Sequence, residues 1–142
     1  MFYICAIMNN TRFATIIHIL TLLAKYPDQW LSSDWIAESI NINPVMVRKE
    51  LSVLHKLGWV ISKKGKEGGT MLNRESCKIS MADIYNAVKN SNVLGKKNTC
   101  GDNCPIGKAI NMELEKLFNE TDEIVVHALE KKSLKSFVDQ FH

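Results

Sequence analysis

The sequence has 142 residues, 46% of them hydrophobic, with only 7 glycines and 3 prolines, which excludes a mainly disordered chain and fits one compact, largely helical domain with or without an oligomerisation element. Its formal net charge of +3 is too small to indicate nucleic-acid binding by itself. Four cysteines without a clear export signal exclude a secreted disulfide framework, and the apolar run at residues 13–24 is shorter than the roughly 18 residues that span a membrane, so we predict a cytoplasmic protein with no membrane partner.

The first predicted element is a helix that begins after Asn10 or Thr11, either of which can cap it, and ends at Tyr26 because Pro27 cannot continue it. We expect residues 1–7 to be an extension without a structural role. The apolar residues of the helix share one face at helical spacing and are predicted to lie in the core: Phe13, Ile16, Ile17, Leu20 and Leu23.

Two further helices are predicted at residues 31–40 and 44–57, joined by only three residues. The first begins with cap residues and an acid suited to the helix dipole, and it places three apolar residues on one side: Ile36, Ala37 and Ile40. Helices joined by so short a connection cross steeply, and the first braces the second, which is the geometry of a DNA-binding helix pair.

The second helix of this pair is the predicted recognition helix. Asn43 can cap its free amides, Pro44 suits the first helical position, and Gly58 suits the C-terminal stop. Four residues at helical spacing are predicted to face the core: Val47, Leu51, Leu54 and Leu57. The residues predicted to contact DNA are the cap and those on the basic, small-residue faces: Asn43, Val45, Arg48, Lys49 and Ser52. The alternative is an ordinary amphipathic surface helix.

A wing is predicted next, from a strand at residues 59–63, a glycine-rich turn at 64–69 and a returning strand at 70–72. Its glycines permit the backbone angles of a tight turn, and its lysines put positive charge where phosphates or a minor groove could be met: Lys63, Lys64 and Lys66. A purely structural hairpin is the alternative. Residues 45–78 contain eight Lys and Arg against three acids, which leaves +5, whereas residues 108–142 contain five lysines against seven acids, which leaves −2. Positive charge is therefore concentrated where phosphate neutralisation requires it.

Ser80 and Asp83 resemble a capping box, so a short helix through Val88 is predicted to close the DNA-binding domain. Residues 89–103 are polar without an apolar period and are predicted to form a loop.

Pro105 then begins a long helix whose apolar residues alternate spacings of three and four, close to a heptad: Ile106, Ile110, Leu114, Leu117 and Ile124. The preceding domain is too small to cover this stripe, so we predict that the same helix of a second subunit covers it. Packing within the chain is the alternative.

The predicted fold class is mainly α with a small β-hairpin wing, in which a winged helix-turn-helix domain is followed by a long C-terminal dimerisation helix. The predicted division has four parts: an extension at residues 1–7, the winged helix-turn-helix domain at 8–90, a sensor loop at 91–104, and the dimerisation helix with a terminal short helix at 105–142.

This order of parts resembles the Rrf-two family of bacterial winged-helix transcription regulators, which includes the iron-sulfur cluster regulator, the nitric-oxide-sensing repressor and the cysteine-metabolism repressor. The matching motifs lie at residues 43–48, 57–60, 65–69 and 79–85. The resemblance implies a homodimer crossed through the long helix, an operator in double-stranded DNA, repression in most members, and a signal sensed between the wing and the dimer helix. The family often has an arginine before the first wing glycine and an aromatic residue after the glycine pair. This chain has Lys64 and Thr70 there, which weakens the case for minor-groove insertion by the wing.

Cluster-binding members of that family carry three cysteines in the loop before the dimer helix, whereas this loop has only Cys100 and Cys104. Two cysteines are half of the about four ligands that a zinc or iron-sulfur site commonly needs, so we predict no cofactor and keep an iron-sulfur cluster as the alternative. A redox switch fits the pair better, because Cys104 precedes a helix start, where the dipole favours the thiolate, and Cys100 could act as its resolving partner. Two inert thiols are the remaining alternative.

These patterns together predict a sequence-specific DNA-binding transcriptional regulator, a homodimeric repressor with redox or small-signal input through the loop cysteines. The alternatives are a regulator that senses through an iron-sulfur cluster and a winged-helix protein-interaction module that does not read DNA. An enzyme is not expected, because no nucleophile, base and orienting acid cluster in the sequence, and no phosphate loop or complete metal motif occurs in it.

Overall fold

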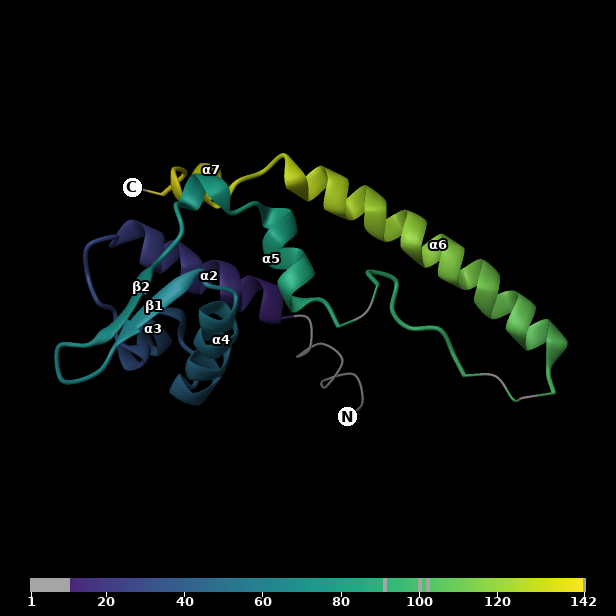
Figure 1. The fold of residues 1–142 in the computed structure, drawn as a ribbon, viewed down its shortest axis with the longest axis horizontal. Helices are drawn as coiled ribbons and strands as arrows, with labels where there is room; N and C mark the ends of the chain where they lie inside the picture. Colours follow the sequence, from purple (N-terminus) through teal and green to yellow (C-terminus); the bar gives the residue numbers. More distant parts are fainter. Residues whose placement is uncertain (1–10, 91, 100, 102, 142) are drawn as a thin grey trace.

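The computed structural model describes residues 11–90, 92–99, 101 and 103–141. The predicted extension at residues 1–7 lies outside the described residues. Figure 1 shows a head of short helices and a hairpin, from which one long helix extends. The elements follow one another as α2 (Arg12–Lys25), α3 (Ser33–Ile40), α4 (Pro44–Lys56), β1 (Val60–Lys63), β2 (Gly69–Leu72), the 3-10 turn η1 (Ser76–Lys78), α5 (Met81–Val88), α6 (Pro105–Glu130) and α7 (Leu134–Val138). The predicted fold class, mainly α with a small hairpin, is confirmed.

The central helix of the head is α2, which contacts α3, α5, α7 and the wing strand β2. Three of its five predicted core residues are buried and two are half-buried; the buried ones are Ile16, Leu20 and Leu23. Ile19 is buried as well. The buried face of α2 is wider than its sequence pattern indicates, because helices pack on it from several directions.

The helix pair α3 and α4 has the predicted caps. The Ser32 hydroxyl accepts the Trp35 N–H at 3.1 Å, and α3 ends at Asn41 in a left-handed conformation with φ of 56°. Asn43 and Pro44 then begin α4. A left-handed residue directly after a helix stops it sharply, which produces the tight turn between the two helices.

The end of α4 differs from the prediction for Leu57. This side chain is 44% exposed and does not face the core. The last helical residue is Lys56, and Gly58 has a φ of 77°, so helical spacing no longer applies at Leu57. The left-handed turn at the glycine brings Trp59 into the core instead.

The wing is an antiparallel pair in which Val60 lies opposite Leu72 and Lys63 opposite Gly69. On its other side β2 pairs with the segment before α3, where Leu31 and Thr70 exchange backbone hydrogen bonds of 3.0 and 2.8 Å. A side chain at Gly69 would meet this segment, since a Cβ there would lie 2.5 Å from the Leu31 carbonyl oxygen. The wing is therefore attached to the helix pair by its backbone.

The predicted capping box of α5 is confirmed, because Ser80 and Asp83 exchange two backbone-to-side-chain hydrogen bonds of 3.0 Å. After α6 the chain returns to the head, where α7 packs on α2 and η1 (Figure 1). Leu134 and Val138 of α7 are buried in the same core as α2. Within the described residues no helix is long and apolar enough to cross a membrane.

Candidate nucleic-acid interface

The recognition helix α4 has one buried side and one exposed side. Its buried residues are Val47, Glu50, Leu51 and Leu54. On the opposite side a row at spacings of four, three and four residues is exposed; we call it the outward row, and its members are Val45, Lys49, Ser52 and Lys56. Of the five DNA contacts predicted on this helix and its cap, three therefore point away from the core together: Val45, Lys49 and Ser52.

Asn43, another predicted DNA contact, caps α4. Its side-chain oxygen accepts the Val45 N–H at 2.9 Å. Asparagine is one of the preferred residues at this position, because its oxygen satisfies an amide that has no partner within the helix. The oxygen of Asn43 is thus engaged in folding α4.

Arg48, the remaining predicted contact on α4, is held by the start of α3. Its guanidinium donates to the Ser33 hydroxyl at 3.2 Å and to the Asp34 carboxylate at 3.1 Å. The arginine and aspartate side chains are 55% and 75% exposed, and so open an ion pair contributes little stability. Arg48 is therefore held at the exposed surface by contacts that contribute little stability.

A shallow cleft of about 440 Å³ lies between α4 and the wing. Arg48, Ser52 and Lys56 line it from the α4 side, and Ser62 and Thr70 line it from the strands. The structure thus brings part of the outward row next to the base of the wing. The three predicted wing lysines are exposed. Lys63 lies 6.0 Å from the ring centre of Trp30, within cation–π range.

The sequence reasoning missed one structural feature of α4, the buried carboxylate of Glu50. Both of its oxygens accept from the Arg12 Nε at 3.0 Å, and Arg12 also donates to the Val88 carbonyl at 3.5 Å. This network joins the recognition helix to α2 and to the end of α5. The available signal was an acid flanked by the apolar residues 47, 51 and 54 on the buried stripe.

A second cluster joins the loop after α5 to the long helix α6. The buried carboxylate of Asp122 accepts from the Val93 N–H at 2.7 Å and the Tyr85 hydroxyl at 3.0 Å, and it pairs with Lys89 at 3.4 Å. Burial alone would raise the pKa of Asp122, but these hydrogen bonds and the lysine charge together hold it below its ordinary value. The pKa of Tyr85 is raised by burial and by its bond to the same carboxylate.

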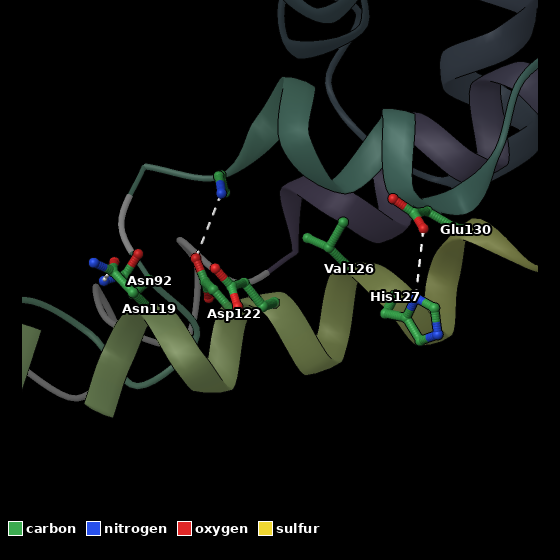
Figure 2. A pocket seen from close by; sticks show the side chains of 8 residues that line it. Asn92, Asn119, Asp122, Val126, His127 and Glu130 are labelled. Atoms are coloured by element: carbon green, nitrogen blue, oxygen red, sulfur yellow. Dashed lines mark hydrogen bonds and ion pairs between the residues drawn. The ribbon is translucent and has the colours of Figure 1, made fainter. Parts of the chain in front are cut away.

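Figure 2 shows the open pocket beside this cluster. Asn92 enters it from the loop, while Asn119, Asp122 and His127 come from α6. The His127 ring faces Glu130 at 3.7 Å on the next turn of the same helix. The lining is polar and lies on the side of α6 that faces α5, so this pocket belongs to the junction between the loop and the long helix.

The apolar stripe of α6 is left uncovered by the described residues. Ile106, Ile110, Leu117 and Ile124 are exposed, by 50 to 73%, and Leu114 is half-buried. The alternative to a partner subunit was that the chain itself packs along this stripe. The described residues do not do so.

Of the two predicted redox cysteines, Cys104 is described and Cys100 lies outside the described residues. Cys104 is exposed at the start of α6, and its sulfur accepts the Gly107 N–H at 3.2 Å. The sequence reasoning placed it correctly at the helix N-terminus. Cys77 lies in η1, against α7 at the far end of α6. A helix of 26 residues is about 39 Å long, which separates Cys77 from Cys104.

Cys100, another candidate ligand for an iron site, lies outside the described residues, so they hold only part of the ligand set that such a site would use. Among them, no group of three or more His, Cys, Asp or Glu side chains could hold a metal ion. Cys104 has a backbone amide as its observed partner, and Cys77 lies too far along the molecule to share a ligand set with it.

The helix pair, the wing paired to it and the exposed outward row define a winged helix-turn-helix transcriptional regulator. Residues 9–140 match the model of the Rrf2 (Rrf-two) family, described as an iron-dependent transcriptional regulator. The chain belongs to this family, as the sequence resemblance predicted.

Individual relatives agree with this assignment. YwnA of Bacillus subtilis (strain 168), a candidate HTH-type transcriptional regulator, is 35% identical over 93% of this chain and 98% of its own length. The crystal structure of a candidate transcriptional regulator from Lactobacillus plantarum matches with a TM-score of 0.74 and 26% identity, over 88% of this chain and 85% of that one. CymR, the global cysteine regulator of B. subtilis, shares the fold with a TM-score of 0.64 at 20% identity, over 93% of this chain and 96% of its own. These relatives are transcriptional regulators and not enzymes.

Proposed function

We propose that the chain binds a two-fold operator in double-stranded DNA as a homodimer and represses transcription by occupying that site. The observation that carries this proposal is the outward row of α4, which is exposed, basic and adjacent to the wing. The major groove of DNA admits an α-helix, and the residues on its outer side then meet base edges and phosphates.

The residues have different roles in this proposal. Lys49, Ser52 and Lys56 lie on the side of α4 that would enter the groove. Arg48 contacts DNA after its exposed pair with Asp34 opens, which costs little. The wing lysines, Lys63, Lys64 and Lys66, contact phosphates, which fix the orientation of the protein but carry no sequence information.

The experiment is a fluorescence-anisotropy titration of the full chain with the DNA upstream of its own gene, at several salt concentrations. Lys66→Gln should weaken binding to every sequence about equally and lower the slope of log K against log salt by about 0.9 per lost phosphate contact in each subunit. Lys116→Gln, on the exposed surface of α6, is the matched control and should leave the slope unchanged. Absence of binding at moderate salt, with and without reductant, would contradict the proposal.

The homodimer is supported by the apolar stripe of α6. An exposed row of large apolar side chains along a long helix is stabilised when an identical helix covers it, and two-fold pairing is the commonest symmetry of soluble oligomers. Two subunits would also present two α4 helices, as a two-fold operator requires. In this proposal the DNA-binding domain comprises residues 8–90 and the dimerisation segment residues 105–142, and the protein acts in the cytoplasm, where a bacterial operator lies.

Redox input through Cys104 and Cys100 is the proposed signal, with residues 91–104 as the sensor loop. It is supported by the exposed sulfur of Cys104 at the start of α6, where an oxidant can reach the thiol. Mild oxidation should then lower operator affinity in the wild type. Cys104→Ser should bind DNA equally well before and after oxidation, and Cys77→Ser, another exposed cysteine, should behave as the wild type. An unchanged response in Cys104→Ser would exclude this input.

A further inference from the structure

The first turn of α4 exposes two apolar side chains, Val45 by 63% and Met46 by 49%. Val45 is the apolar member of the outward row, whose other members are polar. Single exposed apolar residues are common and need no explanation. Here, however, two adjacent apolar residues lie at the N-terminal end of the recognition helix. In helix-turn-helix proteins the side chains at this end contact base edges.

The backbone amides of this turn are already paired. Pro44 has no N–H, the Val45 N–H donates to the Asn43 side chain at 2.9 Å, and the Met46 N–H donates to the Asn43 carbonyl at 3.0 Å. Helix starts bind phosphates through free amides. Since these amides are satisfied within the protein, the start of α4 meets DNA through its side chains.

The major groove offers one prominent apolar group, the C5-methyl of thymine. Valine suits it because its branched side chain is stiff and holds its two methyl groups in a fixed direction from the helix. The flexible Met46 beside it fills the remaining space and keeps water away. We propose that Val45, flanked by Met46, recognises a thymine in each operator half-site through the thymine methyl group. This inference rests on the proposed function and assigns a base to one position of the interface.

The test begins by selecting duplexes from a random library with the full wild-type chain. Each thymine of the selected site is then replaced by deoxyuridine, which removes the methyl group and leaves the hydrogen-bonding groups unchanged. At the contacted position we expect affinity to fall about fourfold for each half-site, the equivalent of burying one methyl group. All other thymines should tolerate the replacement.

The same duplexes are titrated with Val45→Ala, which should bind thymine and deoxyuridine sites equally. The matched control is Val93→Ala, another exposed valine, which lies in the loop beside α6 and should keep the fourfold difference. Val45 is exposed, so the variant keeps its core, and an unchanged thermal midpoint verifies this. The difference between the two variants assigns the methyl contact to Val45.

Each failure has a separate meaning. If the library yields no enriched duplex, the proposed function is rejected and this inference with it. If a site is enriched but it lacks thymine, or no thymine responds to deoxyuridine, DNA binding stands and the methyl contact is wrong. A fourfold difference that persists in Val45→Ala also overturns the assignment.

Discussion

At the scale of single residues, the pairing of Glu50 with Arg12 is central to α4. Glu50 is an acid on the buried stripe of the recognition helix, with its side chain only 3% accessible, and Arg12 holds it from α2. A buried charge is tolerated only when a partner compensates the lost hydration. The angle between α4 and the rest of the head therefore depends on a polar contact as well as on apolar packing.

Arg12→Met should destabilise the fold by about 3 kcal/mol, because it leaves the Glu50 carboxylate buried without its partner. The double variant Arg12→Met/Glu50→Met should recover most of this loss, since both charges are then replaced by apolar side chains. Urea unfolding measures the free energies. Lys116→Met breaks the exposed pair with Glu113 and serves as the control, with an expected change below about 1 kcal/mol. A double variant no more stable than Arg12→Met would contradict the compensation.

Asp122 predicts a dependence of stability on pH. Its folded pKa is lowered, so the unfolded state binds the proton more readily. Its contribution is therefore fully present above the ordinary carboxyl value near 4, and it is lost as the pH falls from there through the lowered folded value. The stability difference between the wild type and Asp122→Asn, from urea unfolding, should be constant between pH 7 and about 5 and should shrink below about 4. Tyr85→Phe should keep this dependence, because Lys89 and the Val93 amide remain. A difference that grew on acidification would refute the assignment.

At the scale of elements, the position of the wing is decided by its contact with the segment before α3. The hairpin is formed by the pairing of its two strands, β1 and β2. The pairing of Thr70 with Leu31 then fixes the hairpin to the helix pair. Gly69 permits this approach because it has no side chain. A wing that is fixed in this way presents its lysines at a constant distance from α4.

Gly69→Ala should therefore displace β2 from Leu31 and cost about 1 to 3 kcal/mol, the loss expected when paired backbone groups are separated. Operator affinity should fall together with stability, because the wing lysines move relative to α4. Thermal unfolding and anisotropy titration measure the two effects. Gly101→Ala is the control, since nothing lies within 4 Å of a Cβ at that position. Full stability in Gly69→Ala would show that the wing is held by other contacts.

At the scale of the whole molecule, α6 separates two surfaces. The side that faces α5 carries Asp122 and anchors the loop, whereas Ile110, Leu117 and Ile124 lie exposed on another side. The start of the loop is thus bound to α6 at Asp122, and Arg12 connects the end of α5 to α4 because it contacts both Val88 and Glu50. These contacts join the start of the loop, the end of α5 and the recognition helix.

Ile124→Lys should shift the protein from dimer to monomer, because it places a charge within the apolar stripe. Met112→Lys is the matched control: Met112 is also an exposed apolar residue of α6, at 62%, but it lies on a different side of the helix. Sedimentation velocity measures both, and operator affinity should fall only in Ile124→Lys. Equal effects of the two substitutions would argue against pairing through this stripe.

The sequence by itself determined the elements whose signals are local. Helix caps at Ser32, Asn43 and Ser80, the glycine turns and the 3.6-residue apolar period specify helices and a hairpin through interactions within a few residues of one another. The outward direction of Val45, Lys49 and Ser52 followed from the same period, so most of the candidate DNA surface was predictable from the chain.

The tertiary structure alone decided the contacts between residues far apart in the sequence. Glu50 meets Arg12 across 38 residues, Asp122 meets Val93 across 29, and α7 returns to cover α2. Local patterns do not identify such partners, because an acid on an apolar stripe or in a helix could pair with many different residues elsewhere in the chain. Leu57 shows over a short distance that periodicity cannot predict such contacts. The left-handed turn at Gly58 leaves Leu57 exposed and places Trp59 in the core. Periodicity specifies which face of an element is buried, but only the packing of all the elements decides which residues meet there.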